Sequence, residues 1–528
     1  MHIFYNGVIH TMDPAYPNPD IIIVDDEHGT IDSVGGFDFR NTMPSMKRVD
    51  LAGRTLLPGF NDAHVHIWKL GLLLTVQVDA RRSVAPDMAA IIEQFRQRAS
   101  ETAAGVWLSG RGYNEVDLPE KRHPTRDDLD RATTNHPIAL TRTCGHMIVA
   151  NSMALELAGI TSETPDPPGG VIVRDSQGQP TGLLQETAMG LITRVIPPYD
   201  DETMGRAIRA AMAHQLSLGI TSATDPLLTP DHLRVYRQLD SAGLLDVRVN
   251  GLPIRRADGG TNTYPLPERY VSDFLRIDTV KFFADGGLSG ATAAISEPYQ
   301  VTGDQGVLRF QTNELAQLMW EAHEHGFRIG THAIGDIALD QVIGIYEELN
   351  ARKPGLRHRI EHLGLPTADH LRRVKAIDAI AVPQTVFLSA LGTSFRRYLP
   401  PHFLPRCYPV RAMLNAGLDV ALSSDAPVVP DDNPLLGIKA AVDRFDPLGE
   451  AIAPEQTITP YEALYAYTMG GAMASGDAAN RGSITPGKWA DLIILSGDPL
   501  REAAISPERL LDIQVEQVYV GGKLVYSV

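Results

Sequence analysis

Short runs of apolar and β-branched residues alternate with amphipathic stretches through most of this chain. Residues 202–217, 314–325 and 337–350 are three such amphipathic stretches. The pattern predicts parallel strands joined by helical crossovers, because parallel neighbours need a long connection. The strand-like runs number eight: 55–60, 218–224, 247–252, 278–284, 327–331, 357–361, 379–382 and 418–422. We therefore expect an α/β fold with a (β/α)8 TIM-like barrel, whose active residues lie at the C-terminal ends of the strands.

Both ends of the chain carry short strand-like pieces. Residues 3–11 and 21–24 near one end, and 490–495 and 515–526 near the other, are rich in apolar and β-branched residues. They predict one small β-sandwich domain built from both termini. The expected division is a composite β domain at 1–54 and 480–528, the barrel at 55–66 and 213–479, and an inserted subdomain at 67–212.

The segment 67–212 is too long to be a simple connection after the first barrel strand. It contains a helical stretch at 86–103, strand-like pieces at 105–109 and 137–142, and a turn signal at 175–178. An insertion at this point would overhang the barrel mouth. We therefore expect it to shape a substrate pocket.

Acidic residues outnumber basic ones, 64 against 47, which makes the formal net charge −17. This balance argues against a nucleic-acid backbone or an anionic membrane surface as the main partner. The two cysteines, Cys144 and Cys407, provide no disulfide framework. The N-terminus shows no basic segment followed by an apolar run, and no stretch of about 18 apolar residues occurs. We expect a cytoplasmic protein without a membrane span.

Two histidines two positions apart, His64 and His66, end the first barrel strand. The period of two in a strand directs both side chains the same way, so both imidazoles can reach one metal ion. His332, His362 and Asp425 end three later strands. The strand ends of a barrel converge on one mouth. Four imidazoles and a carboxylate there predict a site for Zn²⁺, with Mn²⁺, Co²⁺ or Fe²⁺ as alternatives.

Lys281 ends another strand and has two interpretations. It could pair with a carboxylate such as Asp285. It could instead be carboxylated by CO₂, so that its carbamate oxygens bridge two metal ions. A neutral amine is required for the second interpretation, and burial beside cations lowers the pKa of a lysine. The sequence alone leaves both open.

Several motifs resemble those of the amidohydrolase superfamily, specifically amidohydrolase family 3, the YtcJ-like branch that includes N-substituted formamide deformylases. They are Leu-Leu-Pro-Gly-Phe-Asn-Asp-Ala-His-Val-His at 56–66, His-Ala-Ile-Gly-Asp at 332–336, Ile-Glu-His at 360–362, Ser-Asp-Ala-Pro at 424–427 and the segment 482–492. The resemblance covers nearly the whole chain. It implies a metal-dependent hydrolase of a small molecule, with one or two ions per chain, most typically Zn²⁺, in a homodimer.

The resemblance also implies a role for each ligand. His64, His66 and Asp425 hold the more buried metal ion. His332 and His362 hold the more exposed one, and Lys281 bridges them if two ions are present. In the insertion, a Gly-His segment that faces the active site in this branch corresponds to Gly145 and His146. His146 is therefore expected to hydrogen-bond the substrate carbonyl or its oxyanion.

Four more residues of the insertion are candidates for the pocket wall, and each has a structural alternative. Trp107, Tyr113 and Asn114 could contact substrate or belong to a core. Glu186 could face substrate or form a salt bridge. Near the metal ligands, Asp336 is expected to orient His332. Glu361 alternates with His362 along its strand and is expected to face away from the mouth.

The resulting hypothesis is hydrolysis of a C–N bond of an amide, possibly an N-substituted formamide, by metal-activated hydroxide. Asp425 serves as general base and then as general acid. The same site could act on a carbamate, an ester or a cyclic amide, or deaminate a ring. A non-catalytic scaffold or binding protein of the same fold is a further alternative, although no expected ligand is missing. The loop at 392–405 would suit an aryl or carboxylate-bearing substrate, or an ordinary surface.

Overall fold

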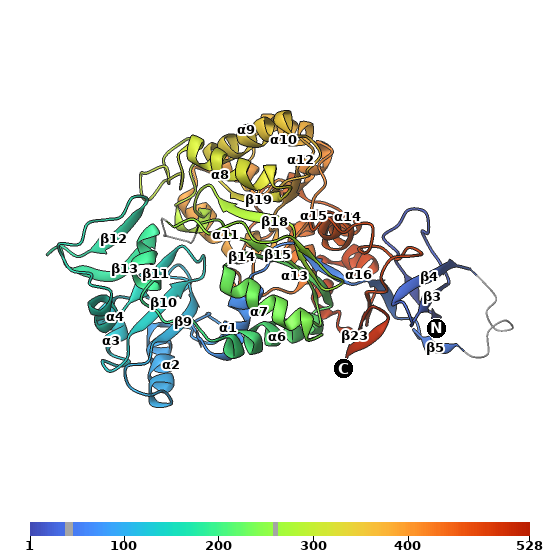
Figure 1. Cartoon of the computed structure of the whole chain (residues 1–528), viewed down its shortest axis with the longest axis horizontal. Helices are drawn as coiled ribbons and strands as arrows, with labels where there is room; N and C mark the ends of the chain where they lie inside the picture. The colour runs from blue at the N-terminus through green and yellow to red at the C-terminus, as the bar shows by residue number, and fades with distance from the viewer. Residues whose placement is uncertain (37–45, 257–261) are drawn as a thin grey trace.

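The computed structural model describes residues 1–36, 46–256 and 262–528 (Figure 1). Its centre is a set of parallel strands whose neighbours along the chain are also neighbours in space. The strands are β7 (Phe60–Asp62), β14 (Ile220–Leu228), β15 (Arg248–Pro253), β18 (Thr279–Phe283), β19 (Arg328–Ala333), β20 (Arg359–His362) and β21 (Ile380–Val382).

Backbone contacts join these strands into a closed ring. Ile254, just after β15, forms a parallel bridge with Lys281 of β18, and Ala381 of β21 bridges Val420. The ring closes where the amide of Ala63 donates to the carbonyl of Leu422 over 3.5 Å. Residues 420–422 thus occupy the eighth position of the ring. In the described structure they form bridge contacts there but not a longer strand. The predicted α/β fold with a TIM-like barrel is confirmed.

Helices cover the outside of the ring, as the amphipathic stretches predict. α6 (Asp201–Ser217), α8 (Thr312–Glu324) and α9 (Asp336–Arg352) match them closely. α7 (Pro230–Ser241) and α10 (Ala368–Ala376) begin at threonines whose side chains accept a hydrogen bond from the third helical residue. In Figure 1, α6 and α7 lie below the barrel strands and α8, α9 and α10 above them. No helix of the described part of the chain combines the length and apolar character that a bilayer crossing requires.

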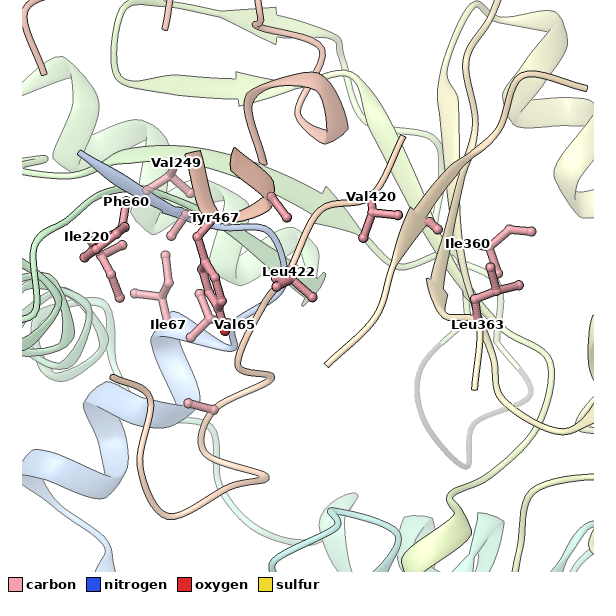
Figure 2. Packing of buried hydrophobic residues seen from close by; sticks show 14 of the residues in the cluster. Phe60, Val65, Ile67, Ile220, Val249, Ile360, Leu363, Val420, Leu422 and Tyr467 are labelled. Atoms are coloured by element: carbon pink, nitrogen blue, oxygen red, sulfur yellow. The ribbon is translucent and has the colours of Figure 1, made fainter. Parts of the chain in front are cut away.

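One large apolar cluster packs the barrel and its helices together. Figure 2 shows part of it, with Val65 and Leu422 near Tyr467. All three side chains are almost completely buried. Because Val65 lies between His64 and His66, this packing holds the first two predicted ligands in place.

The predicted first barrel strand, 55–60, is divided between two sheets. β6 (Thr55–Pro58) pairs with β2 (Val8–Ile9) and β22 (Leu492–Leu495), and only β7 belongs to the barrel. The division falls at Gly59, where an added Cβ would lie 2.1 Å from the Thr221 hydroxyl oxygen. Close approach of the backbone to Thr221 therefore turns the chain from one sheet into the other.

Segments from both termini share one β core. A sheet of β4 (Thr30–Gly35), β3 (Ile21–Asp25), β1 (His2–Tyr5) and β5 (Lys47–Asp50) faces a second sheet. The second sheet contains β2, β6, β22, β23 (Val515–Val520) and β24 (Lys523–Ser527). Phe4 and Ile22 pack with Leu492 and Ile494 in the cluster between them. This arrangement is the small β-sandwich of the expected fold.

The segment after the first barrel strand forms a sheet of its own at the opposite end of the molecule (Figure 1). Its order is β12 (Gly170–Arg174), β13 (Pro180–Glu186), β11 (Met147–Ala150), β10 (Ile138–Arg142), β9 (Leu108–Tyr113) and β8 (Val78–Asp79). α2 (Met88–Ser100) packs on this sheet around Phe95. α1 (Ile67–Thr75) instead packs against α6.

Candidate metal centre

Three predicted ligands lie together where β7 and the segment 420–422 end. One ligand atom from each of His64, His66 and Asp425 lies within 4.8 Å of the other two. His66 Nε2 is 3.2 Å from Asp425 Oδ1, and His64 Nε2 is 3.5 Å from the same oxygen. That oxygen is buried and accepts no hydrogen bond from the described residues. Two nitrogens around an uncommitted carboxylate oxygen fit a Zn²⁺-class ion.

His332 and His362 lie beside this group. The ring of His362 is 5.0 Å from that of His64 and 4.4 Å from that of His332, measured between centroids. The two residues end β19 and β20 as the sequence predicts. The barrel thus brings all four predicted histidines and Asp425 to one mouth.

In each of the four histidines, one ring nitrogen is already occupied by an oxygen of the protein. His64 Nδ1 lies 2.6 Å from Glu361 Oε2, and His66 Nδ1 lies 3.3 Å from the carbonyl of Pro226. Since these oxygens only accept, the Nδ1 atoms carry the protons and each Nε2 keeps its lone pair. Metal-ligating histidines are oriented in this way in proteins.

The two remaining rings follow the same rule. His332 donates from Nε2 to the carbonyl of Gly286 over 3.0 Å, which leaves the lone pair on Nδ1. His362 donates from Nδ1 to Gln384 Oε1 over 2.6 Å. Gln384 is held in that orientation because its Nε2 donates to the carbonyl of Val382 and to the Ser423 hydroxyl. Each ring therefore offers one nitrogen to a ligand.

Electrostatics keep these imidazoles neutral. Burial is the largest effect on each ring and lowers the pKa of His64 and His66 well below the ordinary value. Burial, followed by the neighbouring ring, does the same for His332. Burial and the charge of Lys281 lower the pKa of His362 to about 3. Neutral imidazole is the form that binds a metal ion.

Lys281 lies inside the ring of strands on β18. It is fully buried, and its Nζ makes no hydrogen bond to the described residues. Burial lowers the pKa of Lys281, although Glu361 and Asp425 oppose the change. The alternative in which Lys281 pairs with Asp285 is wrong, because Lys281 Nζ has no hydrogen-bond partner among the described residues, and Asp285 accepts from the backbone amides of Ala294, Ile334 and Gly335.

Glu361 has a role that the sequence interpretation missed. Its side chain does not face away from the mouth as expected; it is fully buried and holds His64, while Arg359 donates to it over 2.6 Å. The alternation fails because β20 ends in a turn. His362 and Leu363 have φ angles of 74° and 44°, in the left-handed region, so the strand geometry no longer applies to the His362 side chain. The Arg-x-Glu spacing at 359–361 was the available signal for the ion pair.

His146 reaches the site from the insertion, on the turn before β11. Its ring lies 5.8 Å from that of His332, and its Nδ1 is 3.1 Å from Glu186 Oε2. Arg309 donates to the same Glu186 oxygen over 2.9 Å. Burial alone would raise the pKa of Glu186, but the charges of His146 and Arg309 lower it to about 2. Glu186 therefore acts as an ionised support for His146, which corresponds to the salt-bridge alternative.

Three other candidates of the insertion do not line the cavity at the site. Trp107 packs against the cluster formed by Ile148 and its neighbours. Tyr113 is fully buried in the core around α2, and its hydroxyl contacts His123 Nδ1 at 3.1 Å. Asn114 accepts from Arg142 over 2.9 Å. Trp107 and Tyr113 pack in the insertion's own clusters, which is the structural alternative for the two aromatic residues, and Asn114 holds Arg142.

Asp336 does not orient His332. Its carboxylate, on the first residue of α9, accepts from the amide and hydroxyl of Ser296 and from Arg406. The carboxylate nearest to His332 is Asp285, with Oδ1 at 3.5 Å from His332 Nε2. The expectation failed because Asp336 is the first residue of the helix after the strand, and its side chain contacts Ser296 and Arg406 instead of His332.

A cavity opens over the predicted ligands. Its polar side contains His146, His332, His362 and Asp425. Its apolar side comes largely from α11 (Val386–Tyr398) and the residues near it: Phe387, Leu391, Phe395, Tyr408, Leu288, Ile334 and Val428. The segment 392–405, for which the sequence left a substrate contact and an ordinary surface open, is helical up to Tyr398. Of the aromatic and basic residues in it, Phe395 lines the cavity and Arg396 pairs with Asp446.

Comparison with known proteins gives a consistent result. A sequence profile of the amidohydrolase family matches residues 47–526. The chain is 30% identical over 537 residues to the amidohydrolase YtcJ of Bacillus subtilis, with 99% of each chain covered. It is 29% identical over 504 residues to the N-substituted formamide deformylase of Arthrobacter pascens, covering 92% of this chain and 90% of the relative.

The fold is also found among solved structures. A metal-dependent hydrolase from Pyrococcus horikoshii superposes with a TM-score of 0.76 and 26% sequence identity. The match covers 94% of this chain and 98% of the other. The similarity therefore includes the barrel, the β-sandwich and most of the insertion.

Proposed function

This chain belongs to the amidohydrolase family and is a metal-dependent hydrolase, and we propose that it cleaves an exocyclic amide bond of a small molecule, such as that of an N-substituted formamide. The observation that carries the proposal is the set of four buried histidines, each with one nitrogen committed to the protein and the other available. The activity for which the Arthrobacter pascens relative is named, deformylation of N-substituted formamides, points to the amide class.

We propose Zn²⁺ as the resident ion, held by His64, His66 and Asp425, with His332 and His362 available for a second ion. When bound, such an ion would supply the Lewis acidity needed to activate water and polarise a carbonyl oxygen. The unpartnered amine of Lys281 is supported as a site of carboxylation by its burial and lowered pKa. Its carbamate would form by addition of the neutral amine to CO₂ with release of one proton.

The chain's own residues then perform the proton transfers. Asp425 accepts a proton from the attacking water and returns it to the leaving nitrogen, which departs as an amine. The Asp425 carboxylate lines the cavity, and no described donor is hydrogen-bonded to its Oδ1. His146, supported by Glu186, donates a hydrogen bond to the substrate oxygen as negative charge develops there. The apolar side of the cavity around Phe387 and Phe395 receives the substituent on nitrogen.

A substrate panel tests the proposal. The metal-loaded protein is assayed with two amides, N-benzylformamide and N-benzylacetamide. It is also assayed with an ester (benzyl formate), a benzyl carbamate and a cyclic amide (a hydantoin). Deamination is tested by measuring the ammonia released from a heterocycle that carries an amino group, the ring amine. We expect turnover of the amides, and a loss of about 10²- to 10⁴-fold in kcat for Asp425→Asn with metal still bound. Turnover restricted to the ester, carbamate, cyclic amide or ring amine would overturn the amide assignment. Full activity of Asp425→Asn would remove Asp425 from the mechanism.

A further inference from the structure

Arg111, on β9 of the insertion, is a buried cation without a partner. Only 6% of it is exposed, yet its Nε and Nη2 have no hydrogen-bond acceptor and no carboxylate of the described residues forms an ion pair with it. Each of the other buried arginines in the described chain donates at least one hydrogen bond: Arg142, Arg248, Arg255, Arg328, Arg359, Arg444 and Arg481.

The neighbouring strand offers a direct contrast. Arg142 of β10 is fully buried, but Glu115 accepts from its Nε over 2.7 Å and Asn114 accepts from its Nη2 over 2.9 Å. Burial of a charged group is costly unless the charge is paired and hydrogen-bonded. Arg142 meets this requirement within the chain. Arg111 finds no such partner among the described residues, which leaves its guanidinium available to an anion from outside the chain.

The position of Arg111 connects it to the active site. An added Cβ on Gly145 would lie only 3.1 Å from Arg111 Nη2, so the guanidinium lies against the turn that carries His146. Gly145 has a φ angle of 75° and is flanked by Cys144 and His146, which both line the cavity. Burial lowers the pKa of Arg111 to about 10, while Cys144 and Asp425 oppose this, as expected for a cation close to both residues.

We propose that Arg111 binds the carboxylate of the substrate and thereby selects acidic amides. This inference rests on the proposed function, because it assigns a substrate class to the same site. A planar guanidinium with uncommitted N–H groups matches a carboxylate, to which it can donate two parallel hydrogen bonds. Arg111 lies behind the turn at Gly145 that borders the cavity, and Phe387, Leu391 and Phe395 in the cavity lining suit an apolar side chain. An N-acylated amino acid with an aromatic or aliphatic side chain combines both features.

The test compares two substrates that differ only by a carboxylate, N-formylphenylalanine and N-formylphenethylamine. The ratio of their kcat/KM values is measured for the wild type, Arg111→Met, Arg111→Lys and Arg131→Met. The last variant is a control, since Arg131 lies in the same insertion with an exposed side chain. We expect the ratio to fall about 100-fold in Arg111→Met and less in Arg111→Lys, which keeps the charge without the planar fork. The control should keep the wild-type ratio. An unchanged ratio in Arg111→Met would overturn the proposal.

Binding and stability measurements keep this test independent of turnover. Calorimetric binding of phenylalanine and phenethylamine to the metal-loaded proteins should show that Arg111→Met weakens only phenylalanine binding. If the wild type hydrolyses neither formamide but still binds phenylalanine through Arg111, the proposed function fails and the carboxylate site stands. Equal binding of phenylalanine by wild type and variant contradicts the site. Arg111→Met should also keep or raise Tm, whereas Arg142→Met, which removes the guanidinium from the buried Glu115, should lower it. A Tm loss in Arg111→Met as large as that in Arg142→Met would indicate a structural role instead.

Discussion

Glu361 shows how a single side chain can serve both folding and the metal site. Its two oxygens receive Arg359 at 2.6 and 2.9 Å and His64 Nδ1 at 2.6 Å, in surroundings from which solvent is excluded. The guanidinium supplies the charge that allows an ionised carboxylate to be buried. The carboxylate in turn sets the tautomer of His64 and leaves Nε2 ready for a ligand. The candidate metal centre therefore depends on an ion pair that lies outside its set of ligands.

Substitution of Glu361 by Gln tests this dependence. We expect metal affinity to fall about 10- to 100-fold, because the amide no longer enforces the His64 tautomer. The free energy of unfolding of the metal-free protein should also fall by about 3–5 kcal/mol, since Arg359 is left without a buried counter-charge. Metal competition with a chelator and urea denaturation measure the two effects. Unchanged affinity in a folded variant would show that His64 needs no such support.

At the scale of elements, close packing of α1 against α6 positions the start of the site. α1 begins directly after His66, and its Gly71 faces α6 so closely that an added Cβ would lie 1.9 Å from the carbonyl oxygen of Ala207. A backbone atom cannot move aside as a side chain can. Any side chain at position 71 must therefore displace one helix, and His66 with it.

A matched pair of glycines separates packing from helix propensity. Gly71→Ala is expected to lower the free energy of unfolding by about 1–3 kcal/mol, the usual cost of overpacking. Gly205→Ala in α6 meets only the side chains of Leu239 and Val235, at 3.8 and 3.9 Å. This second change should raise stability by about 0.5–1 kcal/mol, because alanine favours the helix. Thermal denaturation of both variants checks the signs, and a loss in both or in neither would contradict the packing argument.

Sequence periodicity predicts the barrel well and its special positions poorly. The amphipathic stretches became α6, α8 and α9, since a pattern of about four turns outweighs local exceptions. The order of strand-end ligands placed His64, His66 and Asp425 together. The side chains of Glu361 and Trp107 were not predictable in the same way. The position of the Glu361 side chain depends on the left-handed backbone at His362. Trp107 packs in the cluster around Ile148 and not at the cavity, and periodicity alone does not distinguish these two places.

Arg111 and Gln384 were also missed, for a different reason. Each occupies an ordinary strand or strand-end position, and its importance lies in what its polar atoms contact or fail to contact. Such relations connect segments far apart in sequence. A single sequence contains no local pattern that reports them.

At the scale of the whole molecule, polar contacts join the insertion to the barrel at the cavity. Glu186 of the insertion accepts from Arg309, which lies between β18, the fourth strand of the ring, and α8, and Arg142 donates to the carbonyl of Ser289 over 3.3 Å. Glu186 also holds His146 over the site. The insertion is therefore secured where the substrate would enter.

A fall in pH should weaken the polar contacts of Glu186 between the insertion and the barrel over a defined pH range. The pKa of Glu186 is about 2 in the folded protein and near the ordinary 4.5 when unfolded. Its contribution, about 3 kcal/mol, is fully present above pH 4.5 and is lost as the pH falls toward 2. Glu186→Gln should be less stable at pH 7 and lose less stability between pH 4.5 and 3 than the wild type. Denaturation midpoints across this range measure the difference, with the exposed Glu156→Gln as control. Parallel profiles for Glu186→Gln and wild type would contradict the assignment.

The central claim is that the strand-end histidines and Asp425 form a metal centre, and elemental analysis of the purified chain tests it most directly. Protein prepared without added metal is compared with a His64→Asn/His66→Asn double variant, which keeps the size and polarity of the side chains. We expect one or two Zn²⁺-class ions per wild-type chain and a clear loss in the double variant. A wild-type chain that remains empty after metal and bicarbonate are supplied would contradict the account, as would equal metal content in the two proteins.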